Sequence, residues 1–124
     1  MQTTLYEQVG GEEFFLRLVD AFYKEVESDD VLRAMYPLDL TESKRHLTLF
    51  LIQYWGGPST YQHERGHPRL RMRHAPFRIT KQARDAWMTA MTTALSNVRG
   101  ELSDDQLMDL TSYFEMASSQ MRNV

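Results

Sequence analysis

The sequence predicts a single domain built from α-helices. Apolar side chains recur at three- and four-residue spacing in every long segment, and residues that cap helices precede several of these segments. We find no repeat and no alternating pattern typical of a strand. A chain of 124 residues has room for one hydrophobic core. We therefore expect one all-α domain over residues 1–124.

The first predicted helix begins after the glycine pair at residues 10–11 and ends at Ser28. Charged residues fill much of one face, while apolar residues repeat with the helical period on the other. Such a pattern is typical of a helix that packs one face against a core. The expected core stripe is Phe14, Phe15, Leu18, Val19, Phe22, Tyr23 and Val26.

A short helical turn over residues 30–36 and a second long helix follow. We expect Ser28-Asp29-Asp30 to end the first helix and cap the turn, and Pro37 to stop it. The second helix starts at Thr41 and closes before the Gly-Gly-Pro run at residues 56–58. Its predicted stripe is Ser43, Leu47, Phe50, Leu51 and Tyr54, and its predicted polar face holds Lys44, Arg45 and Thr48.

The second half of the chain predicts a loop, a short helix and two long helices. Glycines and prolines indicate a loop over residues 58–68, and residues 69–74 form at most a short helix that Pro76 breaks. A long helix then runs from Thr80 to near Gly100. Its stripe is Ile79, Ala83, Trp87, Met91, Ala94, Leu95 and Val98. The last helix is capped by Ser103, Asp104 and Asp105. Its stripe is Leu107, Leu110, Phe114, Ala117 and Met121.

Composition excludes several classes of site and partner. The chain has no cysteine, so it has neither disulfides nor thiolate metal sites, and we expect a cytoplasmic protein. A net charge of -3 gives no reason to expect nucleic acid as a partner. The first residues lack the pattern of a signal peptide, and no apolar stretch approaches the roughly 20 residues that span a bilayer. Weak membrane association stays open, as does the choice between a monomer and a homo-oligomer.

The segment His63-Glu64-x-x-His67 matches the pattern of a zinc hydrolase. Such a site needs both histidines on one helical face, with the glutamate between them as the base. Gly66 and Pro68 both disfavour a helix at this point. The context therefore favours two loop histidines, and a zinc hydrolase that uses these three residues is kept as an alternative.

His74 is a different kind of histidine, because it follows Leu70 by four residues on the predicted short helix. A lone histidine beside apolar residues is most often a satisfied core residue. However, Tyr23, Tyr36 and Trp87 also bring polar tips into the predicted core, where these tips need partners. Such a set suits a planar haem with an axial ligand. Packing alone is the alternative, and it would make the chain a cofactor-free helical interaction module.

The run QYWGGPSTYQHERGHPRLRMRHAPFRI at residues 53–79 closely resembles the truncated haemoglobins, specifically their group II (O-type) branch. The likeness extends from LYEQVGG to YFEMA, and it includes the segments AFYKEV, VLRAMYP and RDAW. The resemblance implies a two-over-two helical sandwich, the truncated globin fold, with one haem b.

The resemblance also implies roles for individual residues. His74 would be the proximal ligand of the iron. Distal residues that stabilise a bound ligand would be Tyr23, Tyr36 and Trp87. The family pattern has an arginine that reaches a haem propionate at the position where this chain has His46. Two alternatives stay open for His46, namely a contact with a propionate and a solvated side chain. The remaining residues expected at the haem are Ser43, Leu47, Phe50, Tyr61, Arg71, Arg73 and Phe77.

The function implied by the resemblance is the binding of oxygen and other small ligands, namely carbon monoxide, nitric oxide, cyanide and sulfide. Hydrogen bonds from the distal residues would hold oxygen tightly, which suits turnover better than oxygen transport. Nitric oxide dioxygenase or peroxidase-like activity is therefore expected as a secondary activity, with an unidentified reductase as a partner. Oxygen handling, nitric oxide removal and peroxide chemistry all stay open as the role in the cell.

Overall fold

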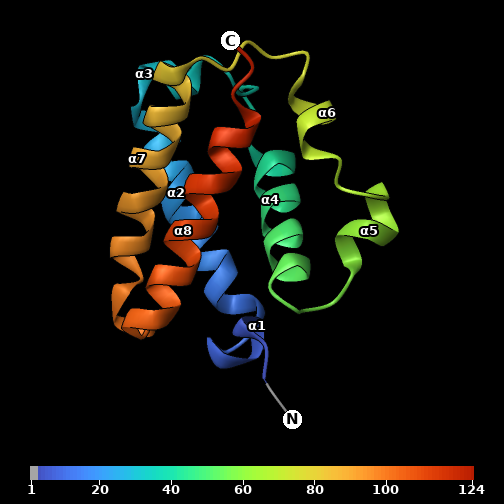
Figure 1. The fold of residues 1–124 in the computed structure, drawn as a ribbon, viewed down its shortest axis with the longest axis vertical. Helices are drawn as coiled ribbons and strands as arrows, with labels where there is room; N and C mark the ends of the chain where they lie inside the picture. Colours follow the sequence, from blue (N-terminus) through green and yellow to red (C-terminus); the bar gives the residue numbers. More distant parts are fainter. Residues whose placement is uncertain (1–2) are drawn as a thin grey trace.

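The computed structural model describes residues 3–124, and these residues form helices without any strand (Figure 1). The all-α prediction is confirmed. The elements are α1 (Leu5–Gln8), α2 (Glu12–Ser28), α3 (Asp30–Arg33), α4 (Thr41–Tyr54), α5 (Thr60–Arg65), α6 (Leu70–His74), α7 (Lys81–Asn97), the 3-10 turn η1 (Arg99–Glu101) and α8 (Asp104–Met121). Among these helices none is long and apolar enough to cross a membrane.

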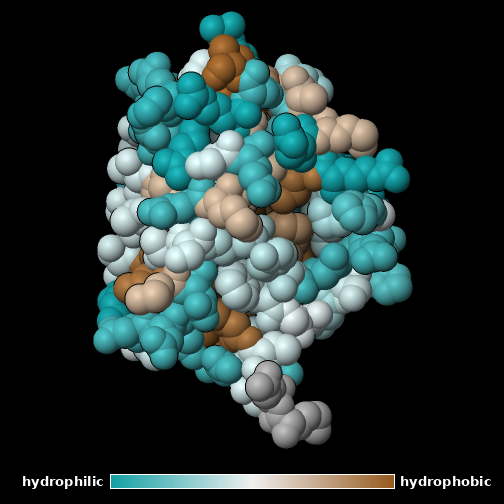
Figure 2. Space-filling model, in the orientation of Figure 1, coloured by the Kyte–Doolittle hydropathy of each residue, from teal (hydrophilic) through white to brown (hydrophobic). Residues whose placement is uncertain are grey.

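Four long helices make up the body of the fold. α2 packs against both α4 and α7, and α7 packs in turn against α8. The arrangement is the expected two-over-two sandwich. In Figure 1 the short helices α5 and α6 lie beyond α4, on the side away from α7. The face shown in Figure 2 is mostly hydrophilic, with apolar residues in small separated areas.

Side-chain caps set where the last two long helices begin. The Thr80 hydroxyl accepts a hydrogen bond from the backbone N–H of Ala83 at 3.1 Å. At the start of α8, Ser103 and Gln106 form a reciprocal capping box. Because these side chains satisfy backbone donors that a helix start leaves free, they fix the first turn of α7 and α8.

The core lies between α2, α4, α7 and α8. Every residue of the stripe predicted for α2 is buried, as the helical period requires. The largest fully buried side chains are Phe14, Phe15, Phe22, Phe114, Leu18, Leu32, Leu51, Met91, Leu95 and Leu110.

On α4 the predicted faces are partly wrong. Thr48 was assigned to the polar face, yet it is only 5% exposed, and its hydroxyl donates to the Lys44 carbonyl at 2.8 Å. Tyr54 was assigned to the stripe, yet it is 49% exposed. α4 contacts α2 and α5, so neighbours cover more of its surface than a single stripe predicts. A hydroxyl that bonds back within its own helix tolerates that burial.

The predicted loop over residues 58–68 is also wrong in part, because Thr60–Arg65 form α5. Tyr61 anchors this helix in the interior, and the backbone N–H of Gln62 donates to the Gln53 side chain at 2.9 Å. Gly66, with φ of 76°, ends it. A helix of six residues is too short to show the periodicity by which longer helices are recognised.

The Gly-Gly pair after α4 lets Thr4 and Tyr6 lie against it. The backbone N–H of Tyr6 donates to the Trp55 carbonyl at 3.0 Å. A Cβ on Gly56 would lie 2.4 Å from Thr4 Cγ2, and Gly56 has a φ of 98°. Both the space and the backbone conformation therefore require glycine at this position.

Candidate functional site

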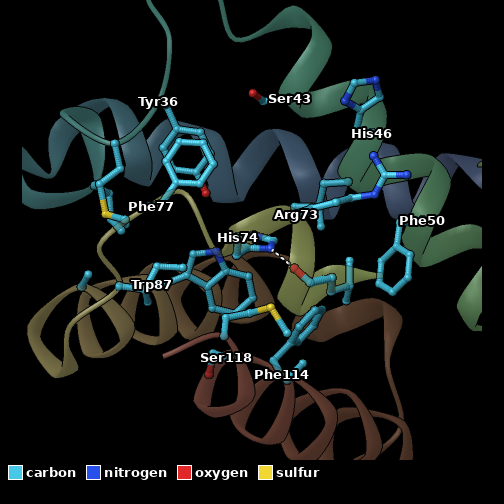
Figure 3. A pocket seen from close by; sticks show the side chains of 18 of the residues that line it. Tyr36, Ser43, His46, Phe50, Arg73, His74, Phe77, Trp87, Phe114 and Ser118 are labelled. Carbon is cyan, nitrogen blue, oxygen red and sulfur yellow. Dashed lines mark hydrogen bonds between the residues drawn. The ribbon is translucent and has the colours of Figure 1, made fainter. Parts of the chain in front are cut away.

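A cavity of about 440 Å³ lies between α2, α4, α6, α7 and α8. Its size is typical of a pocket for a small molecule or a cofactor. Figure 3 shows side chains from these helices arranged around it. The lining is largely apolar and aromatic, with a few polar groups, which is the usual composition of a cofactor site.

The cavity brings together the predicted site residues from six separate segments of the chain. Arg71 is the exception, because it is an exposed residue of α6 outside the cavity lining. The predicted residues that line the cavity are Tyr23, Tyr36, Ser43, His46, Leu47, Phe50, Tyr61, Arg73, His74, Phe77 and Trp87.

His74 is the last residue of α6 and is partly buried at the cavity wall. Its Nδ1 atom lies 2.6 Å from the carbonyl oxygen of Leu70, one helical turn earlier (Figure 3). Because a carbonyl oxygen only accepts, this contact places the ring hydrogen on Nδ1. The Nε2 atom is left with its lone pair, which is the form of imidazole that ligates a metal.

Three polar-tipped aromatic residues reach the cavity from other elements. Tyr23 comes from α2, Tyr36 from the turn after α3 and Trp87 from the middle of α7. The rings of Tyr23 and Tyr36 meet edge to face with centroids 5.5 Å apart. The Trp87 ring lies against Phe22 at 5.1 Å and against Phe114 at 5.8 Å.

Burial keeps the two tyrosines neutral. Desolvation raises the pKa of Tyr23, and the neighbouring Tyr36 raises it further. Desolvation also raises the pKa of Tyr36, although hydrogen bonding from Trp87 and Tyr23 acts in the opposite direction. Since a neutral phenol keeps its O–H donor, the cavity holds hydrogen-bond donors at physiological pH.

Arg73 lines the cavity, but most of its donors bind the backbone. Its Nε atom donates to the Pro68 carbonyl at 2.6 Å, and Nη2 donates to the Arg65 carbonyl at 2.9 Å and the His67 carbonyl at 3.4 Å. Among the hydrogen bonds of the described residues, none uses Nη1 of Arg73. Only this part of the guanidinium is available to a ligand in the cavity.

His46 and Arg65 add polar groups to the same side of the cavity. The Nε2 atom of His46 lies 3.5 Å from a carboxylate oxygen of Glu42. Burial is the main reason that the pKa of His46 is lowered, and the positive charge of Arg65 lowers it further, against the effect of Glu42. His46 is therefore a neutral hydrogen-bonding group at pH 7 rather than a cation.

Sequence reasoning missed one wall of the cavity. α8 contributes Tyr113, Phe114 and Met121, and α7 adds Arg84. Two of these α8 residues stood in the predicted core stripe, because periodicity identifies a buried face without saying whether it meets protein or a ligand. Arg84 donates to the Ser118 hydroxyl at 3.1 Å, an interaction between helices that has no sequence pattern.

The histidines of the zinc pattern do not share a helical face. His63 lies on α5, and Gly66 ends that helix before His67. Both histidines and Glu64 are exposed, and Glu64 pairs with Arg45. Within residues 3–124 no group of three or more His, Cys, Asp or Glu side chains is placed to hold a metal ion.

A small all-helical domain whose apolar cavity is lined by His74, His46 and several polar-tipped aromatics has the features of a globin. Residues 4–120 match the family model described as "Bacterial-like globin", and the chain belongs to this family. Within it, the chain is a group II truncated haemoglobin, as its relatives show.

A group 2 truncated haemoglobin of Bacillus subtilis (strain 168) is 46% identical over 101 residues, which cover 80% of this chain and 76% of that protein. The crystal structure of the haemoglobin of Chloroflexus aurantiacus superposes with a TM-score of 0.95 at 48% identity, covering 99% of this chain and 100% of that one. A structure of a truncated oxygen-avid haemoglobin from Bacillus subtilis gives a TM-score of 0.91 at 41% identity and covers 98% and 100% of the two chains.

Membership of the globin family implies a haem cofactor, and the residues present fit one. The free Nε2 of His74 is the right donor for an axial ligand. The aromatic and aliphatic lining suits a planar apolar ring, and polar groups at His46, Arg65 and Arg73 suit its carboxylates.

Proposed function

We propose that this chain is a cytoplasmic protein that binds one haem b through His74 and holds oxygen in the cavity beside Tyr23, Tyr36 and Trp87. A haem held there would supply an iron that binds oxygen, carbon monoxide, nitric oxide, cyanide or sulfide. The observation that carries the proposal is the contact of His74 Nδ1 with the Leu70 carbonyl, which leaves Nε2 as the ring nitrogen that would hold the iron.

The Leu70 carbonyl has two effects on His74. It holds the ring in one orientation, because the contact at 2.6 Å fixes the Nδ1 side of the imidazole. It also draws the Nδ1 hydrogen toward the oxygen, which would make Nε2 a stronger electron donor to a metal. Since Leu70 belongs to the same short helix, the ligand and the group that orients it move as one unit.

Tyr23, Tyr36 and Trp87 supply the hydrogen bonds that would hold an oxygen ligand. Neutral O–H and N–H donors would stabilise negative charge on a ligand held beside them. Leu32, Phe114 and other apolar residues exclude water from the same space. The result we propose is slow oxygen release, in keeping with the solved relative that is described as oxygen-avid.

The polar groups on the α4 and α5 side of the cavity would bind the haem propionates. Arg65 and the free Nη1 of Arg73 offer charge-assisted bonds, and His46 offers a neutral one. Ser43 and Tyr61 line the cavity as well and add hydroxyl groups. Arg71 is exposed and outside the lining, so we assign it no part in this contact.

The proposal is tested by the rate of oxygen release, measured by mixing the oxygenated protein with excess carbon monoxide. Loss of one donor in Trp87→Phe weakens the hold on oxygen by about 1–2 kcal/mol, which corresponds to release about 10-fold faster. Release at the same rate in this variant would contradict the proposed role of Trp87. A folded protein that takes up no haem at all would favour the cofactor-free interaction module.

A further inference from the structure

The helix that carries His74 has little packing of its own, most of it against α8. α6 has five residues, and none of them is buried. The residues that follow it, 75–78, are exposed. Because an isolated helix of this length is unstable in water, its position depends on its contacts with α8 and on the groups that its two ends contact.

Arg73 holds the beginning of α6. Its guanidinium donates to the carbonyls of Pro68 and Arg65, at 2.6 and 2.9 Å, and so ties α6 to the end of α5. This bond network lies on the N-terminal side of His74. It leaves the C-terminal side of the helix to be fixed by other residues.

Asn123 holds the end of α6. This residue follows α8, and in Figure 1 the chain after α8 meets the connection between α6 and α7. The side-chain Nδ2 of Asn123 donates to the Phe77 carbonyl at 2.8 Å and to the His74 carbonyl at 3.4 Å. Its Oδ1 accepts from the Ile79 N–H at 2.9 Å, and its own N–H donates to the Ile79 carbonyl at 3.0 Å.

We infer that Asn123 is a positioning residue for His74, an inference that rests on the haem-ligating role of His74 proposed above. Asn123 does not line the cavity, so it acts on the site only through the backbone of residues 74–79. It binds the carbonyl of His74 itself and fixes Ile79, which does line the cavity. A shift of this backbone moves Nε2 of His74, and groups that orient a metal ligand tune its bond to the metal.

Two substitutions separate the contacts of Asn123. Asn123→Ala removes both the Oδ1 acceptor and the Nδ2 donor of the side-chain amide. Asn123→Asp keeps an acceptor for the Ile79 N–H but removes the Nδ2 donor to the His74 and Phe77 carbonyls. Arg122→Ala is the matched control, because Arg122 is the neighbouring exposed residue and its Nε donates to the Val124 carbonyl.

The primary measurement is the iron–histidine stretching band in the resonance Raman spectrum of the ferrous holoprotein. We expect the band to shift in Asn123→Ala and in Asn123→Asp and to stay in place in Arg122→Ala. The second measurement is the rate of haem transfer to excess apomyoglobin. We expect transfer about 10-fold faster in Asn123→Ala, the lower end of the effects that follow loss of an outer partner of a metal ligand.

The possible results are distinct. A band that Asn123→Ala leaves unmoved, with unchanged haem transfer, overturns the inference while the proposed function stands. A lower melting temperature with an unmoved band assigns Asn123 a purely structural part and also overturns it. A wild-type protein that takes up no haem and shows no band overturns the proposed function, and the inference about Asn123 falls with it.

Discussion

The ring of Tyr23 meets the ring of Tyr36 edge to face, with centroids 5.5 Å apart. Tyr23 is held on α2, whereas Tyr36 lies in the irregular segment after α3. The contact therefore joins a rigid helix to a segment with little secondary structure of its own. It places two neutral phenols side by side at the cavity.

The first prediction concerns the phenol of Tyr36. In Tyr36→Phe the ring contact with Tyr23 is kept and only the hydroxyl is lost. We expect oxygen release about 10-fold faster, since one hydrogen bond to a partly charged ligand contributes about 1–2 kcal/mol. Stopped-flow displacement by carbon monoxide measures the rate. Tyr6→Phe is the control, because Tyr6 lies outside the cavity lining, and an equal effect in both variants would argue against a specific role for Tyr36.

The second prediction concerns stability in alkaline solution. Burial raises the pKa of Tyr23, Tyr36 and Tyr113 in the folded protein above the usual value of about 10. Below pH 10 both states keep these protons, and their full contribution to stability is present. As the pH rises above about 10, the phenols of the unfolded chain lose protons that the folded chain retains. The free energy of unfolding therefore falls, by up to about 1.4 kcal/mol per pH unit for each phenol.

Urea unfolding at pH 9, 10 and 11 measures this loss. Tyr23→Phe removes one of the three phenols whose pKa is raised, so the free energy of unfolding should fall less steeply between pH 10 and 11 than in the wild type. Parallel curves for the two proteins would show that Tyr23 does not titrate as its burial requires.

The third prediction concerns the glycine pair after α4. In Gly56→Ala a methyl group meets Thr4 and the backbone keeps a φ of 98°. We expect the free energy of unfolding to fall by about 2 kcal/mol. Gly100→Ala is the matched control, since nothing lies within 4 Å of a Cβ at that position, and we expect a change within about 0.5 kcal/mol. Thermal or urea unfolding compares the two, and equal losses would mean that the close approach to Thr4 is not important.

The fourth prediction concerns metal removal. His63, Glu64 and His67 are exposed and form no metal site, so His63→Ala should bind haem as the wild type does. Treatment with EDTA should leave the melting temperature of the protein unchanged. Stoichiometric zinc in the purified protein, lost in His63→Ala, would instead support the zinc hydrolase alternative.

The long helices of the fold could be predicted from the sequence because each has several turns of periodic apolar residues and two of them carry side-chain caps. The stripe of α2 is confirmed residue by residue. α5 could not be predicted, since six residues give no period and its stability comes from the buried ring of Tyr61 and the side chain of Gln53. These contacts exist only after the chain has folded.

The sequence predicts those cavity residues that belong to a recognisable pattern, and it does not predict the remaining lining residues. His74 and the polar-tipped aromatics stand out by residue type, and the resemblance to a known family gave the rest of the predicted set. Arg65, Arg84 and the α8 wall had no such signal. The backbone contacts of Arg73 and Asn123 depend on loop geometry, which spacing along the chain does not encode. Enzymatic activity and the reductase stay predictions.

The central claim, that His74 holds a haem in this cavity, is tested most directly by the visible absorption spectrum of the purified protein reduced with dithionite, before and after carbon monoxide is added. We predict a Soret band that shifts sharply with carbon monoxide in the wild type and is lost in His74→Ala. A wild-type protein that stays colourless when haem is offered would contradict the claim, as would a Soret band unchanged in His74→Ala.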